Sequence, residues 1–295
     1  MTDLIFGVGV PTAAGPGAGP VAQAREAERL GYDFVSAADH PCGADPSYDT
    51  PTMLTWIAAH TSRISVASRV LAVPFRRPAL VAKAAASLDA LSGGRFILGL
   101  GGGYDDAEIA ALGGPVPSAR AKVDGLAEAV RIIRGAWTED GFGYAGAHYS
   151  VRDLTMAPKP GRRVPVWMGT FGPRALAVTG ALADGWIPSL GFADPADLPA
   201  MRHRIDEAAR AAGRDPGEIR GVFNVNIRVD PGAAPRDDIV TGSPVRVADQ
   251  LRRFLDLGFT GLSFLPAGPG RADQIRRIAE EVIPSLGDAV SGTRH

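Results

Sequence analysis

The sequence predicts an α/β fold, a (β/α)8 TIM barrel with a small insertion after the fourth βα unit. Short apolar runs alternate with amphipathic helical stretches along nearly the whole chain. Eight such runs can be counted, and all but one connection between them carries a helical pattern, as in a parallel barrel. With 295 residues, 45% of them apolar, the chain is long enough to form one such domain over residues 1–295.

The fourth strand is the clearest element. Residues 96–100 form an apolar run typical of a strand buried on both faces, and three glycines, Gly101 to Gly103, follow it directly. The helical pattern before this strand ends at the glycine pair Gly93 and Gly94. The glycine-rich loop therefore lies at the carboxyl end of a central strand, where barrels of this class hold their catalytic residues.

The remaining elements follow from the same periodicities. Strands are expected at residues 4–10, 34–37, 64–73, 164–168, 185–188, 222–229 and 260–265. Helices are expected at residues 21–30, 51–60, 118–137, 195–212, 244–257 and 274–283, with a further one ending at Leu91 and another starting at Pro173. Residues 231–242 are expected to form a loop. Only residues 139–165 interrupt the alternation, as a hairpin followed by an extended linker.

Composition and missing motifs exclude several classes of function. The net charge of −1, with no basic block, argues against nucleic acid as a partner. No run of 18 apolar residues predicts a membrane span, and no signal peptide is recognisable, so we expect a cytoplasmic protein. The five histidines and one cysteine lack metal-ligand spacing, so no metal site is predicted. A dinucleotide fingerprint is also absent, because Tyr104 stands where its last glycine belongs.

Two ionisable residues, Asp39 and His40, end the second predicted strand. An imidazole near its ordinary pKa moves protons in either direction at pH 7, so His40 is the candidate catalytic residue. Asp39 should point to the other side of the strand, and either contact a ligand or cap the next turn. The acidic residues at positions 105, 106 and 108 are interpreted as the favourable start of a helix.

Four segments together resemble the luciferase-like monooxygenase superfamily. They are Ala-Asp-His at residues 38–40, the stretch from Arg76 to Leu-Ser-Gly-Gly-Arg at 91–95, the glycine-rich loop with its acidic residues at 98–108, and Val-Trp-Met-Gly-Thr-Phe-Gly-Pro-Arg with Ala-Asp-Gly-Trp at 166–186. The resemblance covers nearly the whole chain. It leans to the branch that uses the deazaflavin coenzyme F420, since that branch commonly carries Asp-His after strand two. Flavin mononucleotide (FMN) is the alternative cofactor.

The resemblance implies a cofactor lying across the barrel mouth. It also implies a bulge with a non-proline cis peptide at the end of strand three, near Val70, Leu71 and Ala72. Asp39 and His40 would contact the cofactor as well. Gly102 and Gly103 would let backbone approach it. A second glycine turn would present amides and a hydroxyl to its phosphate, from Gly169, Thr170 and Gly172.

The family resemblance implies an F420-dependent oxidoreductase that transfers a hydride between the deazaflavin and a small organic substrate. An FMN-dependent monooxygenase, with a flavin reductase as partner, is one alternative; a non-catalytic cofactor-binding barrel is another. A homodimer is implied too. The chain departs from the sugar-phosphate dehydrogenases of the family at Tyr104 and Ala44, where they carry Glu and Trp. The substrate is therefore left open, with its contacts expected from the loops at 41–51, 141–165 and 191–196.

Overall fold

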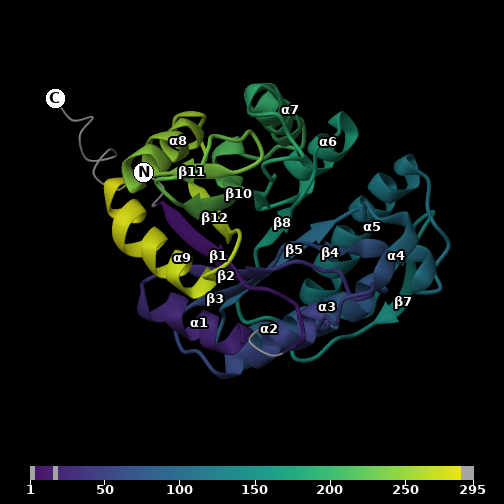
Figure 1. Cartoon of the computed structure of the whole chain (residues 1–295). Coiled ribbons are helices and arrows are strands. Elements are labelled where there is room, and N and C mark those ends of the chain that lie inside the picture. Colours follow the sequence, from purple (N-terminus) through teal and green to yellow (C-terminus); the bar gives the residue numbers. More distant parts are fainter. Residues whose placement is uncertain (1–3, 16–18, 287–295) are drawn as a thin grey trace.

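The computed structural model describes residues 4–15 and 19–286, and within them the chain forms a closed parallel barrel surrounded by helices (Figure 1). The barrel strands are β1 (Ile5–Gly9), β2 (Phe34–Ala37), β3 (Ser65–Ser68) with β4 (Leu71–Ala72), β5 (Phe96–Gly101), β8 (Val166–Met168), β9 (Gly185–Trp186), β10 (Arg220–Val229) and β12 (Gly261–Pro266). Each pairs in parallel with its neighbours, and the pairing of β9 with β10 closes the ring. The predicted (β/α)8 barrel is confirmed.

The helices connect successive strands and pack on the outside of the barrel. They are α1 (Pro20–Arg29), α2 (Thr50–Ala59), α3 (Pro78–Leu91), α4 (Asp106–Ala111), α5 (Ala119–Thr138), α6 (Pro173–Leu182), α7 (Leu198–Ala211), α8 (Pro244–Asp256) and α9 (Arg271–Arg277). Proline opens several of them, and Asp49, Ser118 and Ser243 cap α2, α5 and α8 by accepting a hydrogen bond from a backbone amide of the first turn.

Two expectations for individual elements were wrong in detail, and one helix was left without a range. The third strand, expected at 64–73, is divided into β3 and β4. The non-proline cis peptide bond expected at this point is confirmed, between Arg69 and Val70. The expected loop at 231–242 ends in a short strand, β11 (Val240–Gly242), which pairs with β10. Helix α4 was not assigned a range from the sequence, because its single turn and a half is too short for a periodicity to register.

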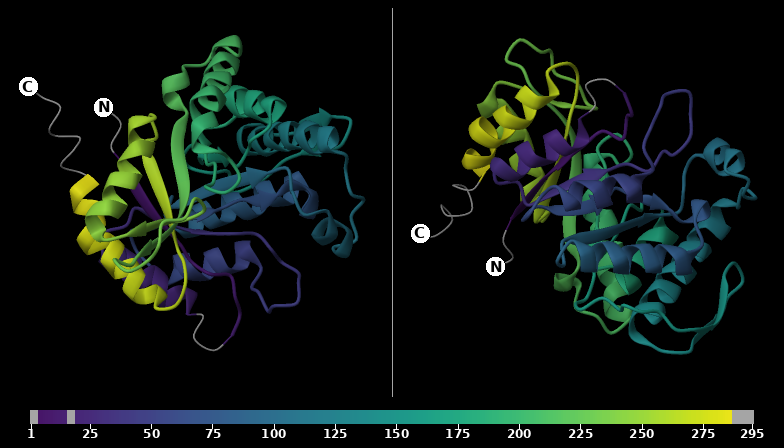
Figure 2. Two further views of the ribbon diagram at one scale, coloured as in Figure 1. Left: turned by 45° about the horizontal axis from the view of Figure 1, so that its top comes forward. Right: turned by 90° about the horizontal axis from the view of Figure 1, so that it is seen from below.

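Residues 142–154 form an antiparallel hairpin of β6 (Phe142–Ala145) and β7 (Ser150–Leu154) inside the predicted insertion at 139–165. It lies between α5 and β8 in sequence and projects away from the barrel strands (Figures 1 and 2). The carboxylate of Glu128 on α5 fixes its turn by accepting hydrogen bonds from the amides of residues 147–149. A single domain over residues 1–295 stays a prediction, since both ends lie outside the described ranges.

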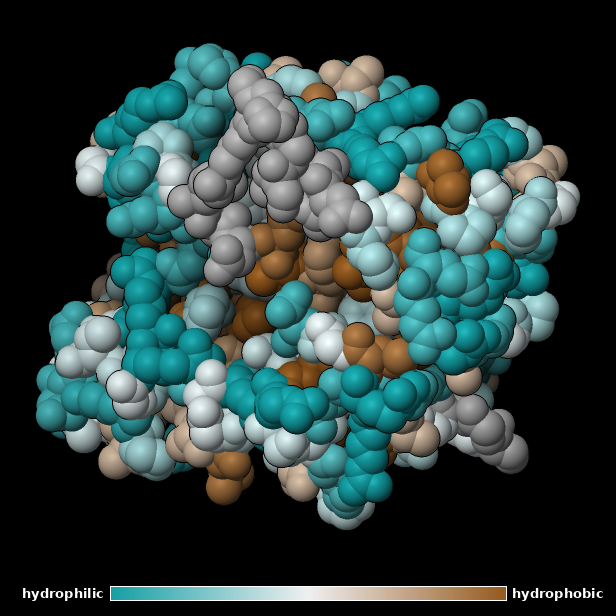
Figure 3. Space-filling model, turned by 90° about the vertical axis from the view of Figure 1, so that its left-hand side faces the viewer, coloured by the Kyte–Doolittle hydropathy of each residue, from teal (hydrophilic) through white to brown (hydrophobic). Residues whose placement is uncertain are grey.

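The barrel interior is closed below the site by a compact apolar cluster. Phe34, Ala67, Trp167, Ile187 and Val222 pack there, all of them at most 4% exposed. Side chains alternate along a strand, so Arg69, two residues after Ala67, points into the barrel above this floor. On the face shown in Figure 3, hydrophilic residues cover most of the rim and hydrophobic residues gather in a central hollow.

Candidate active site

A cavity of about 430 Å³ lies at the carboxyl ends of the barrel strands. Its volume falls within the range of small-molecule sites, and its position is where barrels of this type bind ligands. Nine of the ten predicted site residues line it: Asp39, His40, Val70, Ala72, Gly102, Gly103, Gly169, Thr170 and Gly172.

Leu71 is the predicted site residue that does not line this cavity. Its side chain is 5% exposed and contacts the hydrophobic core beneath α3, bordering a separate cavity there with Val81 and Leu88. The reason is the alternation of an extended chain: Val70 and Ala72 face the mouth, so the residue between them faces outward.

Asp39 holds the segment that follows the cis peptide bond. Its fully buried carboxylate accepts hydrogen bonds from the Ala72 amide at 3.1 Å and from both terminal nitrogens of Arg76, at 2.7 and 3.0 Å. Arg76 also pairs with Asp49, the capping residue of α2. Asp39 therefore lines the cavity while the guanidinium of Arg76 neutralises its charge.

The glycines of β5 make room mainly for the chain's own bulge. A side chain at Gly99 would meet the Ser68 carbonyl oxygen at 1.9 Å, and one at Gly101 would meet the Val70 side chain at 2.7 Å. Gly103 adopts a φ of +76°, which favours glycine. At Gly102 a Cβ would make only ordinary contacts with Lys122, so the chain's own packing does not require glycine there, and its close approach to a cofactor stays a prediction.

The second glycine turn leads into the amino end of α6. The Gly169 amide is used within the sheet, where it donates to the Leu100 carbonyl. The Thr170 hydroxyl faces inward, 2.6 Å from that of Thr179, so it is not presented to the mouth as expected. Among the described residues, the amides of residues 170–172 donate to no other group. They remain free to bind a ligand at a helix amino terminus.

His40 is the centre of a three-residue hydrogen-bonded chain. Its Nδ1 lies 3.0 Å from the Glu108 carboxylate, and its Nε2 lies 3.3 Å from the Tyr104 hydroxyl. The side chain of His40 is 41% exposed and that of Glu108 only 12%. A carboxylate can only accept, so Nδ1 carries a proton, and in the neutral form of the ring Nε2 is the nitrogen that can accept from Tyr104.

Tyr104 supplies a proton to this arrangement. Burial of its hydroxyl, together with the charges of Glu108 and Asp105, raises the pKa of Tyr104 above its usual value of 10. The phenol is therefore neutral at physiological pH and donates to Nε2. The three groups can hold or pass a proton at one point of the cavity wall.

Glu108 was missed as a functional residue by the sequence reasoning. The expected helix start is correct, because Asp105 caps α4 by accepting from the amides of Ala107 and Glu108. That cap turns the Glu108 side chain toward His40, 68 residues earlier in the chain. The spacing of an acidic residue one helical turn after Tyr104 was the signal available in the sequence.

An aromatic wall continues from His40 across the cavity. The ring of Tyr104 packs edge-on against Phe192 at 5.7 Å, and Phe192 stacks on Phe171 at the same separation. Tyr104 and Phe192 are more than 60% exposed. Of the three loops expected to contact substrate, only 191–196 lines the cavity, through Phe192; the loops at 41–51 and 141–165 do not.

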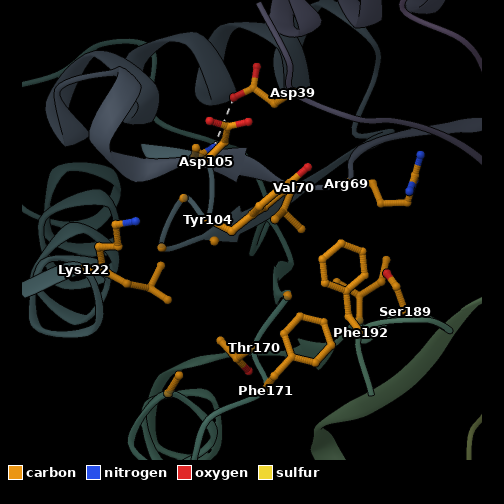
Figure 4. Close-up of a pocket in the computed structure, with 18 of the residues that line it drawn as sticks. Asp39, Arg69, Val70, Tyr104, Asp105, Lys122, Thr170, Phe171, Ser189 and Phe192 are labelled. Carbon is orange, nitrogen blue, oxygen red and sulfur yellow. Dashed lines mark hydrogen bonds between the residues drawn. The ribbon is translucent and has the colours of Figure 1, made fainter. Parts of the chain in front are cut away.

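Figure 4 shows how the charged and aromatic side chains are distributed. Lys122 and Asp105 lie on one side of the cavity, Arg69 lies on the other, and Val70 and Tyr104 lie between them. Lys122 is paired with Asp106. Across residues 4–15 and 19–286, no group of three metal-ligating side chains is found, and none of the helices is long and apolar enough to cross a membrane.

Curated relatives match almost the full length of the chain. An F420-dependent glucose-6-phosphate dehydrogenase from Intrasporangium calvum is 27% identical, and the match covers 88% of this chain and 92% of the relative. The protein of the same name from Kineococcus radiotolerans is 28% identical, over 88% of this chain and 90% of the relative.

Solved structures share the fold. An F420-dependent secondary alcohol dehydrogenase, in complex with an F420–acetone adduct, superposes with a TM-score of 0.86 at 19% identity, covering 96% of this chain and 99% of that one. The coenzyme F420 dependent tetrahydromethanopterin reductase from Methanopyrus kandleri gives a TM-score of 0.84 at 22% identity, with the same coverage.

The family model described as luciferase-like monooxygenase matches residues 6–236, which span β1, the His40 site, both glycine turns and most of the barrel. The chain belongs to the luciferase-like monooxygenase family.

Proposed function

We propose that this protein is an F420-dependent oxidoreductase that transfers a hydride between the deazaflavin and a small organic substrate. The observation that carries the proposal is the chain from Glu108 through His40 to Tyr104 at the wall of a cavity large enough for a small ligand. The names of the full-length relatives, F420-dependent dehydrogenases, support the choice of cofactor.

The cavity fits such a cofactor in shape and in polarity. Val70 provides an apolar surface on which a flat ring can rest, and the aromatic side chains of Tyr104 and Phe192 line the same cavity. The unengaged amides at the amino end of α6 suit a phosphate. Asn224 also lines the cavity, and its buried Oδ1 accepts no hydrogen bond within the described residues, so it is available to a donor group of the substrate.

When bound, the deazaflavin donates or accepts a hydride at C5. The protein's task is to hold the substrate carbon against that position and to exchange one proton with the substrate's oxygen or nitrogen. His40 Nε2 takes up or releases this proton. Glu108 keeps the ring in the required tautomer and stabilises its charged form. Tyr104 donates to Nε2 when the ring is neutral and accepts from it when the ring is charged.

A direct test compares His40→Ala with His203→Ala, a control histidine on α7 that is 69% exposed and pairs with Glu207 outside the cavity. Enones, imines and alcohols are screened with the cofactor, and turnover is followed by cofactor fluorescence. We expect His40→Ala to lose about 100-fold or more in rate while retaining cofactor affinity, and the control to be unchanged. Unchanged turnover in His40→Ala would remove the residue from the mechanism.

We also propose that the protein acts on small molecules in the cytoplasm, as a homodimer. The family resemblance supports the dimer, and the net charge of −1 supports a role without nucleic acid. Light scattering on the purified chain checks the oligomeric state: twice the 30.7 kDa chain mass is expected, and a monomer at all concentrations contradicts it.

A further inference from the structure

Arg69 places a cation without a partner in the wall of the cavity. It precedes Val70 at the end of β3, two residues after Ala67 of the barrel floor, so it reaches into the barrel interior. Its guanidinium forms no hydrogen bond or ion pair in the described part of the chain, and its Nε is buried. The residue as a whole keeps partial exposure, through the cavity.

The carboxylates near the cavity are committed elsewhere. Asp39 binds Arg76, and Glu108 binds His40. Burial, and then the positive charge of Arg271, lowers the pKa of Arg69 to about 10, which still leaves the guanidinium charged at pH 7. Arg271 itself is held by the carbonyls of Gly9 and Pro266 and by Gln23, with no acid among these partners. This end of the cavity therefore carries uncompensated positive charge.

A partly buried cation without a counterion costs folding free energy, and several other partly buried arginines of the described residues have an acidic partner. Arg76, Arg134 and Arg162, for example, each bind a buried or half-buried aspartate. The missing partner of Arg69 is thus best supplied by a ligand, and the group that matches a planar guanidinium is a carboxylate or phosphate.

The position of Arg69 indicates that its guanidinium faces the substrate and not the cofactor. It lies one side-chain layer above the apolar floor, on the side of the cavity opposite Lys122 (Figure 4). The long anionic tail of F420 must run out to solvent, and the free amides at the start of α6 suit its phosphate. A compact anionic group on the substrate suits the inner end beside Arg69.

We infer that Arg69 binds the carboxylate of the substrate, so that the enzyme acts on small organic acids. Asn224, whose buried Oδ1 is unpartnered in the described residues, lines the same cavity and accepts from a hydroxyl or N–H of the same molecule. The substrate class rests on the proposed function, whereas the anion site itself does not.

The test uses the full-length protein, the probe malonate and its neutral analogue malonamide, with binding measured by calorimetry in the absence and presence of F420. Arg69→Met keeps the length of the side chain and removes its charge. Arg246→Met is the matched control, because Arg246 is exposed on α8 and lines neither cavity. Circular dichroism verifies that both variants are folded.

We expect the wild type and Arg246→Met to bind malonate but not malonamide, and Arg69→Met to bind malonate about 10- to 100-fold more weakly. F420 affinity should differ by less than about threefold between the wild type and Arg69→Met. Malonate binding that is absent in the wild type, or unchanged in Arg69→Met, overturns the inference. So does a loss of F420 affinity in Arg69→Met, since the guanidinium then faces the cofactor. If the wild type binds malonate through Arg69 but no F420, the anion site stands and the proposed function fails.

Discussion

Replacing Glu108 by Gln separates the role of the carboxylate from the packing of the side chain. The imidazole Nδ1 and the Glu108 carboxylate are 3.0 Å apart, a distance at which a unit charge pair is worth about 1.4 kcal/mol in water and about 5.5 kcal/mol at an effective dielectric of 20. His40 is 41% exposed, so solvent screening favours the lower part of this range.

We take about 2 kcal/mol as the stabilisation of charged His40, which corresponds to about a 30-fold loss of rate in Glu108→Gln for a step that charges the imidazole. The assay is hydride transfer to the best substrate from the screen, followed by cofactor fluorescence. Because Glu108 acts through His40, imidazole ¹⁵N NMR supplies a second readout. The wild type should show a protonated Nδ1 and a bare Nε2, and the variant should show a mixture of tautomers.

Glu207→Gln is the control for this substitution. Glu207 also accepts from a histidine, His203, at 3.1 Å, but both side chains are more than 60% exposed on α7 and lie outside the cavity. Its rate should match the wild type. A wild-type rate in Glu108→Gln, or a neutral His40 protonated mainly on Nε2, would refute the reasoning about the chain from Glu108 to Tyr104.

Three further predictions concern stability. Arg69→Met should raise the free energy of unfolding of the ligand-free protein by about 1 to 2 kcal/mol, because it removes an unpaired buried charge; a lower melting temperature contradicts this. Gly99→Ala should destabilise by more than about 3 kcal/mol in urea unfolding, since its Cβ would lie 1.9 Å from the Ser68 carbonyl oxygen, and tolerance of alanine would show that this contact is relaxed in solution. Burial alone would raise the pKa of Asp184, but Arg134, the Val166 amide and Arg163 outweigh it and hold the pKa below 3.8. The stabilisation by Asp184 is therefore fully present above the unfolded-state pKa and is lost as the pH falls through the lower folded-state pKa. Asp184→Asn should cost about 2 to 3 kcal/mol at pH 7 and less at pH 3, and an equal cost at both pH values argues against the ion pairs as its source.

The sequence was most informative where local chemistry decides the structure. The apolar run of β5 with its glycines, the glycine pair that follows α3, and the proline that opens α6 located elements to within a residue or two. His40 followed from its place at the end of β2. These signals depend on neighbouring residues, which are visible in one sequence.

Features that depend on distant partners were not predictable. Glu108 and His40 are 68 residues apart, and Asp39 meets Arg76 across 37 residues. The inward direction of Arg69 follows from the alternation between Ala67 in β3 and Arg69 just after that strand, but its lack of a counterion is visible only when the surrounding acids are placed. The outward direction of Leu71 was not predictable either, because the cis peptide bond between Arg69 and Val70 interrupts the regular strand just before it.

The central claim is that this barrel binds the deazaflavin, and the most direct test is a fluorescence titration of the purified protein with F420 and, separately, with FMN. The account predicts saturable binding of F420 and at least about tenfold weaker binding of FMN. Preference for FMN would contradict it and indicate an oxygen-using monooxygenase served by a flavin reductase. Binding of neither cofactor would contradict it as well, and would favour a barrel that has lost this chemistry.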